Sequence, residues 1–221
     1  MRKDMFILWL KKILNKIPFI KKIVLICFYF IVNFKNNFTM FKYYFYNYFL
    51  SYYPSYHIRH WYLKYILHIK LQDRCFVHLG CYFYGSNIEI GKGSVIGRHC
   101  QLCGDIKIGN NCSITAYSFL QSISHDKNSP TFECCSSKII IQDYVWLGAY
   151  SMVLCGGGGL SKNMRTPTSI IIGKGAILGA NSTTTKNIPA FKVYAGTPAK
   201  EIGIRNEEAC VYDLDYHPAW N

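Results

Sequence analysis

The chain has 221 residues, half of them hydrophobic, and a formal net charge of +13. This length fits one domain, or one domain with an extension, and the composition is sufficient for a hydrophobic core. The charge is unevenly distributed. Residues 1–70 carry twelve Lys or Arg and one acidic residue, whereas residues 71–221 carry thirteen and eleven. Since the positive charge is confined to the N-terminal third, we predict no nucleic-acid partner.

The N-terminal third combines basic residues with aromatic residues, and we predict that residues 1–70 form a helical extension. Such a composition suits the surface of an anionic membrane. The most apolar run, residues 23–32, is ten residues long, whereas a helix that crosses a bilayer needs about twenty. We therefore predict peripheral contact of residues 1–50 with an anionic membrane. The alternative is that these helices pack against the rest of the protein.

The next part of the chain repeats an aliphatic residue at every sixth position, at Ile90, Ile96, Leu102, Ile108, Ile114 and Leu120. A helix would repeat near 3.6 residues and a strand near two. A period of six is typical of a parallel β-helix with three short strands in each coil of eighteen residues. We thus predict a mainly β domain over residues 71–204, with a tail at 205–221. In this domain Ile90 should stack on Ile108, and Ile96 on Ile114.

The cysteines fit this repeat better than they fit a disulfide framework. Cys100 and Cys112 stand at a position of the repeat where a small residue lets the corner of the coil close. Cys100 and Cys103 form a CxxC motif, but no second CxxC and no suitably placed pair of histidines accompanies it. We predict free buried thiols in a reducing cytoplasm, and no metal.

Two insertions interrupt the repeat, near residues 121–138 and 154–169. The first contains the sequence SHD, which presents His125 and Asp126. The second reads CGGGGLSKNMRTPTS and is rich in glycine. It lacks the Gly-Lys-Ser/Thr ending of a phosphate-binding loop, so we predict a protruding loop instead.

The segments SHDKNSPTF, VWLGAYSMVL and TKNIPAFKVYAGTPAK resemble the hexapeptide-repeat O-acetyltransferases, in particular those of the colanic-acid and capsule type. The resemblance covers about residues 55–204. It implies a left-handed parallel β-helix that assembles as a homotrimer. It also implies that acetyl-CoA lies in the groove between neighbouring barrels and that a loop histidine is the general base. His125 occupies the position of that histidine.

The reaction explains why a histidine is needed. An alcohol that attacks a thioester must lose its proton, and a neutral imidazole can accept it near neutral pH. Asp126 and a main-chain carbonyl of the loop are the two candidates for orienting the ring. The alternative for His125 is an exposed loop histidine without a catalytic role.

For the cofactor, the resemblance points to Ala149, Ala180, Thr185, Lys186 and Lys200. The small residues would let the pantetheine arm lie against the coil, and the lysines would meet the phosphates of CoA. Many relatives carry a further basic residue where this chain has Gly203. We expect Arg205 to substitute for it.

Together these features predict an acetyl-CoA-dependent O-acetyltransferase that acts on a sugar hydroxyl in capsule or exopolysaccharide biosynthesis. The expected location is the cytoplasm, with association at the cytoplasmic face of the membrane. Two alternatives stay open: an N-acetyltransferase for an amino sugar or an antibiotic, and a β-helix that serves only as a scaffold.

Overall fold

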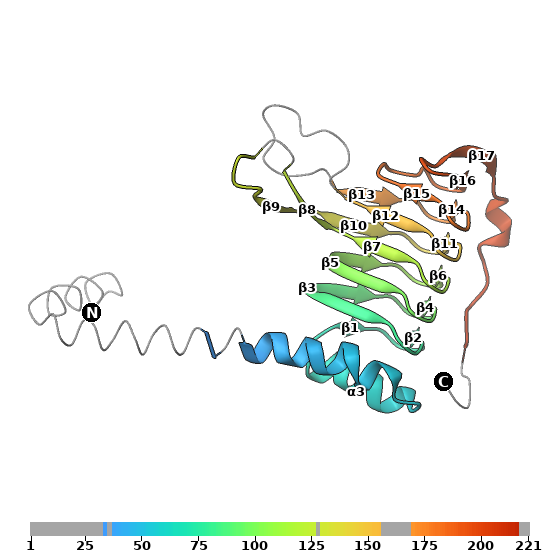
Figure 1. The fold of residues 1–221 in the computed structure, drawn as a ribbon. Helices are drawn as coiled ribbons and strands as arrows, with labels where there is room; N and C mark the ends of the chain where they lie inside the picture. The colour runs from blue at the N-terminus through green and yellow to red at the C-terminus, as the bar shows by residue number, and fades with distance from the viewer. Residues whose placement is uncertain (1–32, 35–36, 127–128, 156–168, 217–221) are drawn as a thin grey trace, which may run out of the picture. The chain divides into compact units, whose positions relative to one another are not determined.

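The computed structural model describes residues 33–34, 37–126, 129–155 and 169–216 (Figure 1). Residues 43–221 form one compact unit and residues 1–42 another. The predictions for the apolar run at 23–32 and for most of the glycine-rich loop lie outside the described residues. Within the described ranges, no helix is both long and apolar enough to cross a bilayer.

The larger unit is a parallel β-helix whose coils have three faces. The strands of the first face pair in parallel and are β2 (Phe76–Val77), β4 (Val95–Ile96), β6 (Ser113–Ile114), β11 (Trp146–Leu147), β14 (Ile177–Leu178) and β16 (Lys192–Ala195). On the last of these lies the antiparallel strand β17 (Lys200–Ile204). Figure 1 shows the coils stacked from β1 and β2 near α3 to β16 and β17 at the other end.

Two long strands, β3 (Tyr82–Ile90) and β5 (Gln101–Ile108), run across both remaining faces. The second face continues with β7 (Phe119–Gln121), β12 (Met152–Leu154) and β15 (Thr183–Thr184), and the third face contains β1 (Lys70–Leu71), β10 (Lys138–Ile141) and β13 (Ile170–Ile172). We call the corner between the first and second faces the first corner. The second corner joins the second and third faces, and the third corner joins the third and first faces.

The aliphatic residues of the six-residue repeat fill the interior. Ile90 pairs with Ile108 and Ile96 with Ile114, as the sequence predicts, and all four side chains are buried. Each coil therefore contributes three inward-pointing residues to a continuous hydrophobic column. Such a fold is stabilised by contacts between neighbouring coils.

The corners are closed by small buried residues and by a left-handed backbone conformation. Ser94 donates a hydrogen bond to the Gly109 carbonyl at 2.7 Å and accepts one from the Cys112 amide at 2.9 Å, so it joins two coils. Cys100 and Cys112 are buried, as expected for their corner positions. At the second corner Gly85 has a φ of +138°, and a Cβ there would lie 2.4 Å from the Gly104 carbonyl oxygen. Glycine lets β3 turn this corner without a break.

Both insertions begin at the second corner, one coil apart. After β7 the chain forms an antiparallel hairpin of β8 (Ile123–His125) and β9 (Cys134–Ser136), and the second insertion begins after β12. Leu154 pairs with Gln121, so the starting points of the two insertions lie side by side. Ile141 pairs with Ile108, so the chain returns to the same position of the coil after the hairpin.

Residues 43–65 cover the end of the barrel at β1 and β2. They include the C-terminal part of a helix at 37–48, the short helix η1 (Leu50–Tyr52) and α3 (Tyr56–Tyr65). Asn47 is bonded to both the amide and the carbonyl of Phe83, at 3.0 and 2.9 Å. The buried Arg59 donates to the Val77 carbonyl at 3.1 Å. Residues 43–65 therefore pack against the barrel, which is the alternative to membrane contact that the sequence left open. We call residues 43–65 the cap.

After β17 the chain returns along the third corner to the first coils (Figure 1), where the Tyr216 and Phe76 ring centroids are 5.2 Å apart. Arg205 donates to the Tyr144 carbonyl at 2.8 Å, and the Leu214 amide donates to Asn111 at 3.1 Å. Farther along, Asp213 pairs with Arg74 of the first coil at 2.6 Å. This C-terminal strap, residues 205–216, therefore connects the last coils to the first.

We expect deletion of residues 206–221 to lower the free energy of unfolding by about 1–3 kcal/mol. The deletion removes hydrogen bonds and contacts that hold distant coils together, and a solenoid otherwise depends on neighbours alone. Urea unfolding followed by circular dichroism measures the change. Deletion of residues 217–221 alone is the control. Equal stability of the two truncated chains would contradict a role for the strap.

Candidate active site

His125 lies at the end of β8, on the hairpin that projects from the second corner. The hairpin register places it opposite Cys134, and the Asp126 amide donates to the Glu133 carbonyl at 2.9 Å. His125 and Cys134 are thus a non-hydrogen-bonded pair of the antiparallel ladder, and their side chains lie close together on one face of the hairpin. The His125 side chain is exposed in the single chain.

The imidazole of His125 is oriented by Phe132. Its Nδ1 lies 3.0 Å from the Phe132 carbonyl oxygen, and the two rings stack with centroids 4.1 Å apart. A carbonyl oxygen can only accept, so Nδ1 must carry the proton in this hydrogen bond. Nε2 of a neutral ring is then left with its lone pair. Of the two groups predicted to orient the ring, the partner of Nδ1 is the main-chain carbonyl.

The conformation of Phe132 makes this contact available. Its φ is +52°, in the left-handed region, and its amide donates to the Ser129 carbonyl at 3.1 Å. A tight turn thereby points the carbonyl back toward β8. Phe132 could not be identified from the sequence, because a main-chain contact of this kind requires no particular residue type.

Ala149 and Ala180 lie at the first corner, in the same position of successive coils, since Leu147 pairs with Leu178 two residues earlier. The Ala149 carbonyl accepts a hydrogen bond from the Asn181 amide at 2.8 Å. The Ala180 side chain is exposed and that of Ala149 is partly exposed. Because these side chains are short, a ligand chain could lie close to the backbone along this corner.

Thr185 and Lys186 follow β15 at the second corner, the corner that also carries the hairpin. Thr184 fixes this turn, because its hydroxyl donates to the Lys186 carbonyl at 2.8 Å. Lys200 begins β17, and the preceding Ala199 donates its amide to the Thr183 carbonyl at 2.8 Å. Both lysine side chains are exposed. The structure thus places Lys186 and Lys200 at the end of the second face that lies farthest from the cap.

The predicted residues do not all meet within one chain. His125, Thr185 and Lys186 belong to the second corner, whereas Ala149 and Ala180 belong to the first. Ala149 and Leu154 are five positions apart along the chain, which corresponds to about 16 Å of extended backbone. The base and the alanines therefore lie at opposite edges of the second face.

The expectation for Arg205 was wrong. Its guanidinium donates to the Tyr144 and Gly175 carbonyls, at 2.8 and 3.3 Å, and to the Tyr212 hydroxyl at 3.3 Å. These partners lie along the third corner, whereas Lys200 lies at the second face. Arg205 fastens the strap and cannot replace the basic residue missing at Gly203.

A parallel β-helix with a six-residue repeat is the fold of the hexapeptide-repeat transferases. The family model described as bacterial transferase hexapeptide (six repeats) matches residues 87–121. A relative from Lysinibacillus sphaericus, named "Probable macrolide acetyltransferase", is 30% identical over 153 residues, which are 63% of this chain and 77% of the relative. The chain belongs to the hexapeptide-repeat acetyltransferases and is an acetyltransferase with their left-handed parallel β-helix fold.

Two further proteins support this assignment. The Escherichia coli K12 protein named "Putative colanic acid biosynthesis acetyltransferase WcaF" is 33% identical over 126 residues. The aligned part is 56% of this chain and 62% of WcaF, so it spans less than two thirds of that relative. The crystal structure of a maltose O-acetyltransferase from Clostridium difficile 630 has a TM-score of 0.59 at 20% identity, and covers 77% of this chain and 86% of that one.

Proposed function

We propose that this acetyltransferase moves the acetyl group of acetyl-CoA to a sugar hydroxyl in capsule or exopolysaccharide biosynthesis. The observation that carries the proposal is the hydrogen bond between His125 Nδ1 and the Phe132 carbonyl. It leaves Nε2 as the acceptor of a proton, which is the state a general base requires at neutral pH.

In the proposed reaction Nε2 of His125 removes the proton of the acceptor hydroxyl as its oxygen attacks the thioester carbonyl. The tetrahedral intermediate then collapses, the bond between carbon and sulfur breaks, and the CoA thiolate takes the proton from the imidazolium. Asp126, next to the base, is proposed to contribute to its electrostatic environment. The Phe132 carbonyl stabilises the imidazolium because it accepts a hydrogen bond from the Nδ1–H group throughout the reaction.

We propose that the site is shared between chains of a homotrimer. His125 projects from the second corner, whereas Ala149 and Ala180 lie at the first. A neighbouring barrel that presents its first corner to this hairpin would bring the two halves together. Acetyl-CoA would then lie between the barrels, with its pantetheine along the alanines and its phosphates near Lys186 and Lys200.

Membrane association is also part of the proposal. Residues 1–50 carry nine Lys or Arg and one acidic residue, interleaved with aromatic residues. Such a segment favours the anionic cytoplasmic face, where a lipid-linked saccharide acceptor would be available.

The acceptor class can be tested by following the release of free CoA thiol. The assay compares neutral saccharides with amino sugars of the same ring configuration, at saturating acetyl-CoA. We expect turnover with the neutral saccharides and an ester product. A product in which only the amino nitrogen is acetylated would favour the N-acetyltransferase alternative. No thiol release with any acceptor would favour the scaffold.

A further inference from the structure

The outer side of the cap exposes six large aromatic residues. We call this group the aromatic cap surface and define it as Tyr44, Phe45, Tyr48, Phe49, Trp61 and Tyr65. Each of these side chains is between 39 and 59% exposed. Monomeric soluble proteins rarely leave a large apolar patch uncovered without a binding partner for it.

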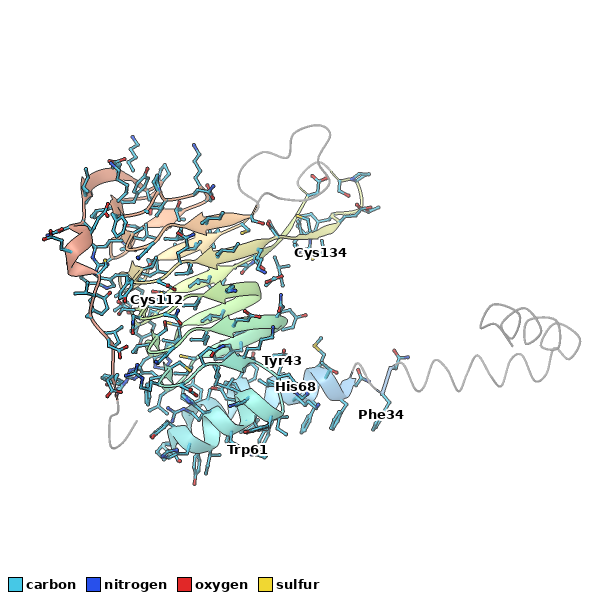
Figure 2. The ribbon with its side chains drawn as sticks, turned by 180° about the vertical axis from the view of Figure 1, so that it is seen from behind. Phe34, Tyr43, Trp61, His68, Cys112 and Cys134 are labelled. Atoms are coloured by element: carbon cyan, nitrogen blue, oxygen red, sulfur yellow. The ribbon has the colours of Figure 1, made fainter. Side chains whose placement is uncertain are left out.

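The surface is built from the outward faces of two helices. Tyr46 and Asn47 of the first helix point to the barrel, which turns Tyr44 and Tyr48 outward. On α3 the buried residues are Arg59 and Leu63. Figure 2 shows Trp61 on the side of α3 that faces away from the barrel.

Ring contacts join the members. The Tyr44 and Tyr48 rings have centroids 4.8 Å apart, and Phe45 stacks on Phe49 at 6.0 Å. Phe45 also contacts Tyr62 of α3 at 5.9 Å, and on the same helix Trp61 lies 6.3 Å from Tyr65. The members thus form one group on the first helix and another on α3, and the contact of Phe45 with Tyr62 shows that the two helices lie side by side.

The cap itself carries no acidic residue, and none occurs in the sequence between Asp4 and Asp73. The Lys64 ammonium lies over the Tyr65 ring at 5.7 Å from its centroid, at the edge of the surface. Beside it is a hollow of about 260 Å³, whose lining includes Trp61, Lys64 and Tyr65 of the cap and Asp73 and Arg74 of the first coil.

From these features we infer that the aromatic cap surface is a docking site for an anionic lipid bilayer. Tyrosine and tryptophan combine an apolar body with a polar tip and are enriched where headgroups meet acyl chains. A second copy of the chain fits less well, because its own cap has no acidic residue to pair with Lys64. The inference deepens the proposed membrane contact, and it is independent of the proposed acetyl transfer.

The proposed trimer would strengthen this contact. A three-fold rotation leaves the direction along its axis unchanged, so barrels aligned with the axis present their caps on the same side. Three copies of the surface would then meet one bilayer together, and weak individual contacts would add up through avidity.

The test is flotation of the full-length protein with vesicles of phosphatidylcholine mixed with phosphatidylglycerol. The variants are Trp61→Ser with Tyr65→Ser, and Tyr48→Ser with Phe49→Ser. The matched control is Ile204→Ser with Val211→Ser, which removes two exposed apolar side chains, one at the end of β17 and one on the strap. We expect each cap variant to bind roughly tenfold more weakly, because each loses two large side chains from the bilayer contact. The control should bind like the parent.

Three results would overturn the inference. The first is cap variants that bind like the parent, including the case in which only deletion of residues 1–42 abolishes binding. The second is a parent protein that ignores these vesicles. The third is a cap variant that changes the size of the protein in solution without lipid, which would make the surface a contact between chains. Thiol release with a soluble acceptor, measured on the same samples, reports the proposed acetyl transfer separately.

Discussion

Replacement of His125 with alanine is expected to lower kcat by about two to four orders of magnitude, the usual contribution of a general base. The acceptor hydroxyl would have no group to take its proton during attack on the thioester. Because the His125 side chain is exposed on a hairpin outside the barrel, the variant should fold like the parent. The rate with a saccharide acceptor and the thermal unfolding curve are the two measurements.

A second variant distinguishes a base from a residue that only shapes the loop. The side-chain amide of His125→Gln can still donate a hydrogen bond to the Phe132 carbonyl, but it cannot take a proton from the acceptor hydroxyl. His125→Gln should therefore be about as slow as His125→Ala. His57→Ala, the same change at an exposed histidine of α3, is the matched control. Near-parental kcat in a folded His125→Ala protein would end the assignment of the base.

The cap should be sensitive to acid because of His60. This ring is packed between α3 and the barrel, and its Nε2 accepts a hydrogen bond from the Val77 amide at 3.1 Å. Burial, together with the positive charge of Arg59, lowers the pKa of His60 to about 4. In the unfolded chain the same group titrates near its ordinary value of about 6.5. Above that pH the ring is neutral in both states and contributes no pH dependence.

Between these two values the unfolded chain holds more protons at His60 than the folded chain does. The free energy of unfolding should therefore decrease as the pH falls from about 6.5 to about 4, by roughly 3 kcal/mol in total from this residue. Urea unfolding at a series of pH values measures the change. His60→Gln can still accept from the Val77 amide and does not titrate, so its stability should vary less over this range. An equal slope in both proteins would exclude His60 as the source.

The coils could be predicted because one interior position repeats. Ile90, Ile96 and Ile108 fix the period, and the pairing follows from it without knowledge of distant contacts. The cap could not be predicted in the same way. Arg59 looks like a surface residue in the sequence, yet it is buried and donates to main-chain carbonyls of the cap and the barrel. Hydrogen bonds of this kind to main-chain carbonyls depend on the tertiary fold and leave no periodic signal in the sequence.

The same distinction between sequence pattern and tertiary contacts applies to the candidate site. His125 could be named as a candidate from the sequence because it lies in a segment that interrupts the repeat, where side chains are free to serve a function other than packing. The partner of its Nδ1 could not, since the Phe132 carbonyl reaches the ring only through a left-handed turn. The sequence also could not show that the Arg205 guanidinium is hydrogen-bonded to the barrel, because its partners are carbonyls 30 and 61 residues away.

The central claim is that one chain supplies the base and its neighbour supplies the alanine-lined corner. Complementation tests it most directly. His125→Ala and Ala180→Trp, which would block the pantetheine path at an exposed position, should each be nearly inactive when produced alone. When the two are produced together in equal amounts, random assembly gives about one quarter of the sites an intact His125 and an intact Ala180 corner. The account predicts recovery of about that fraction of parental activity, and mixed oligomers with no recovered activity would contradict it.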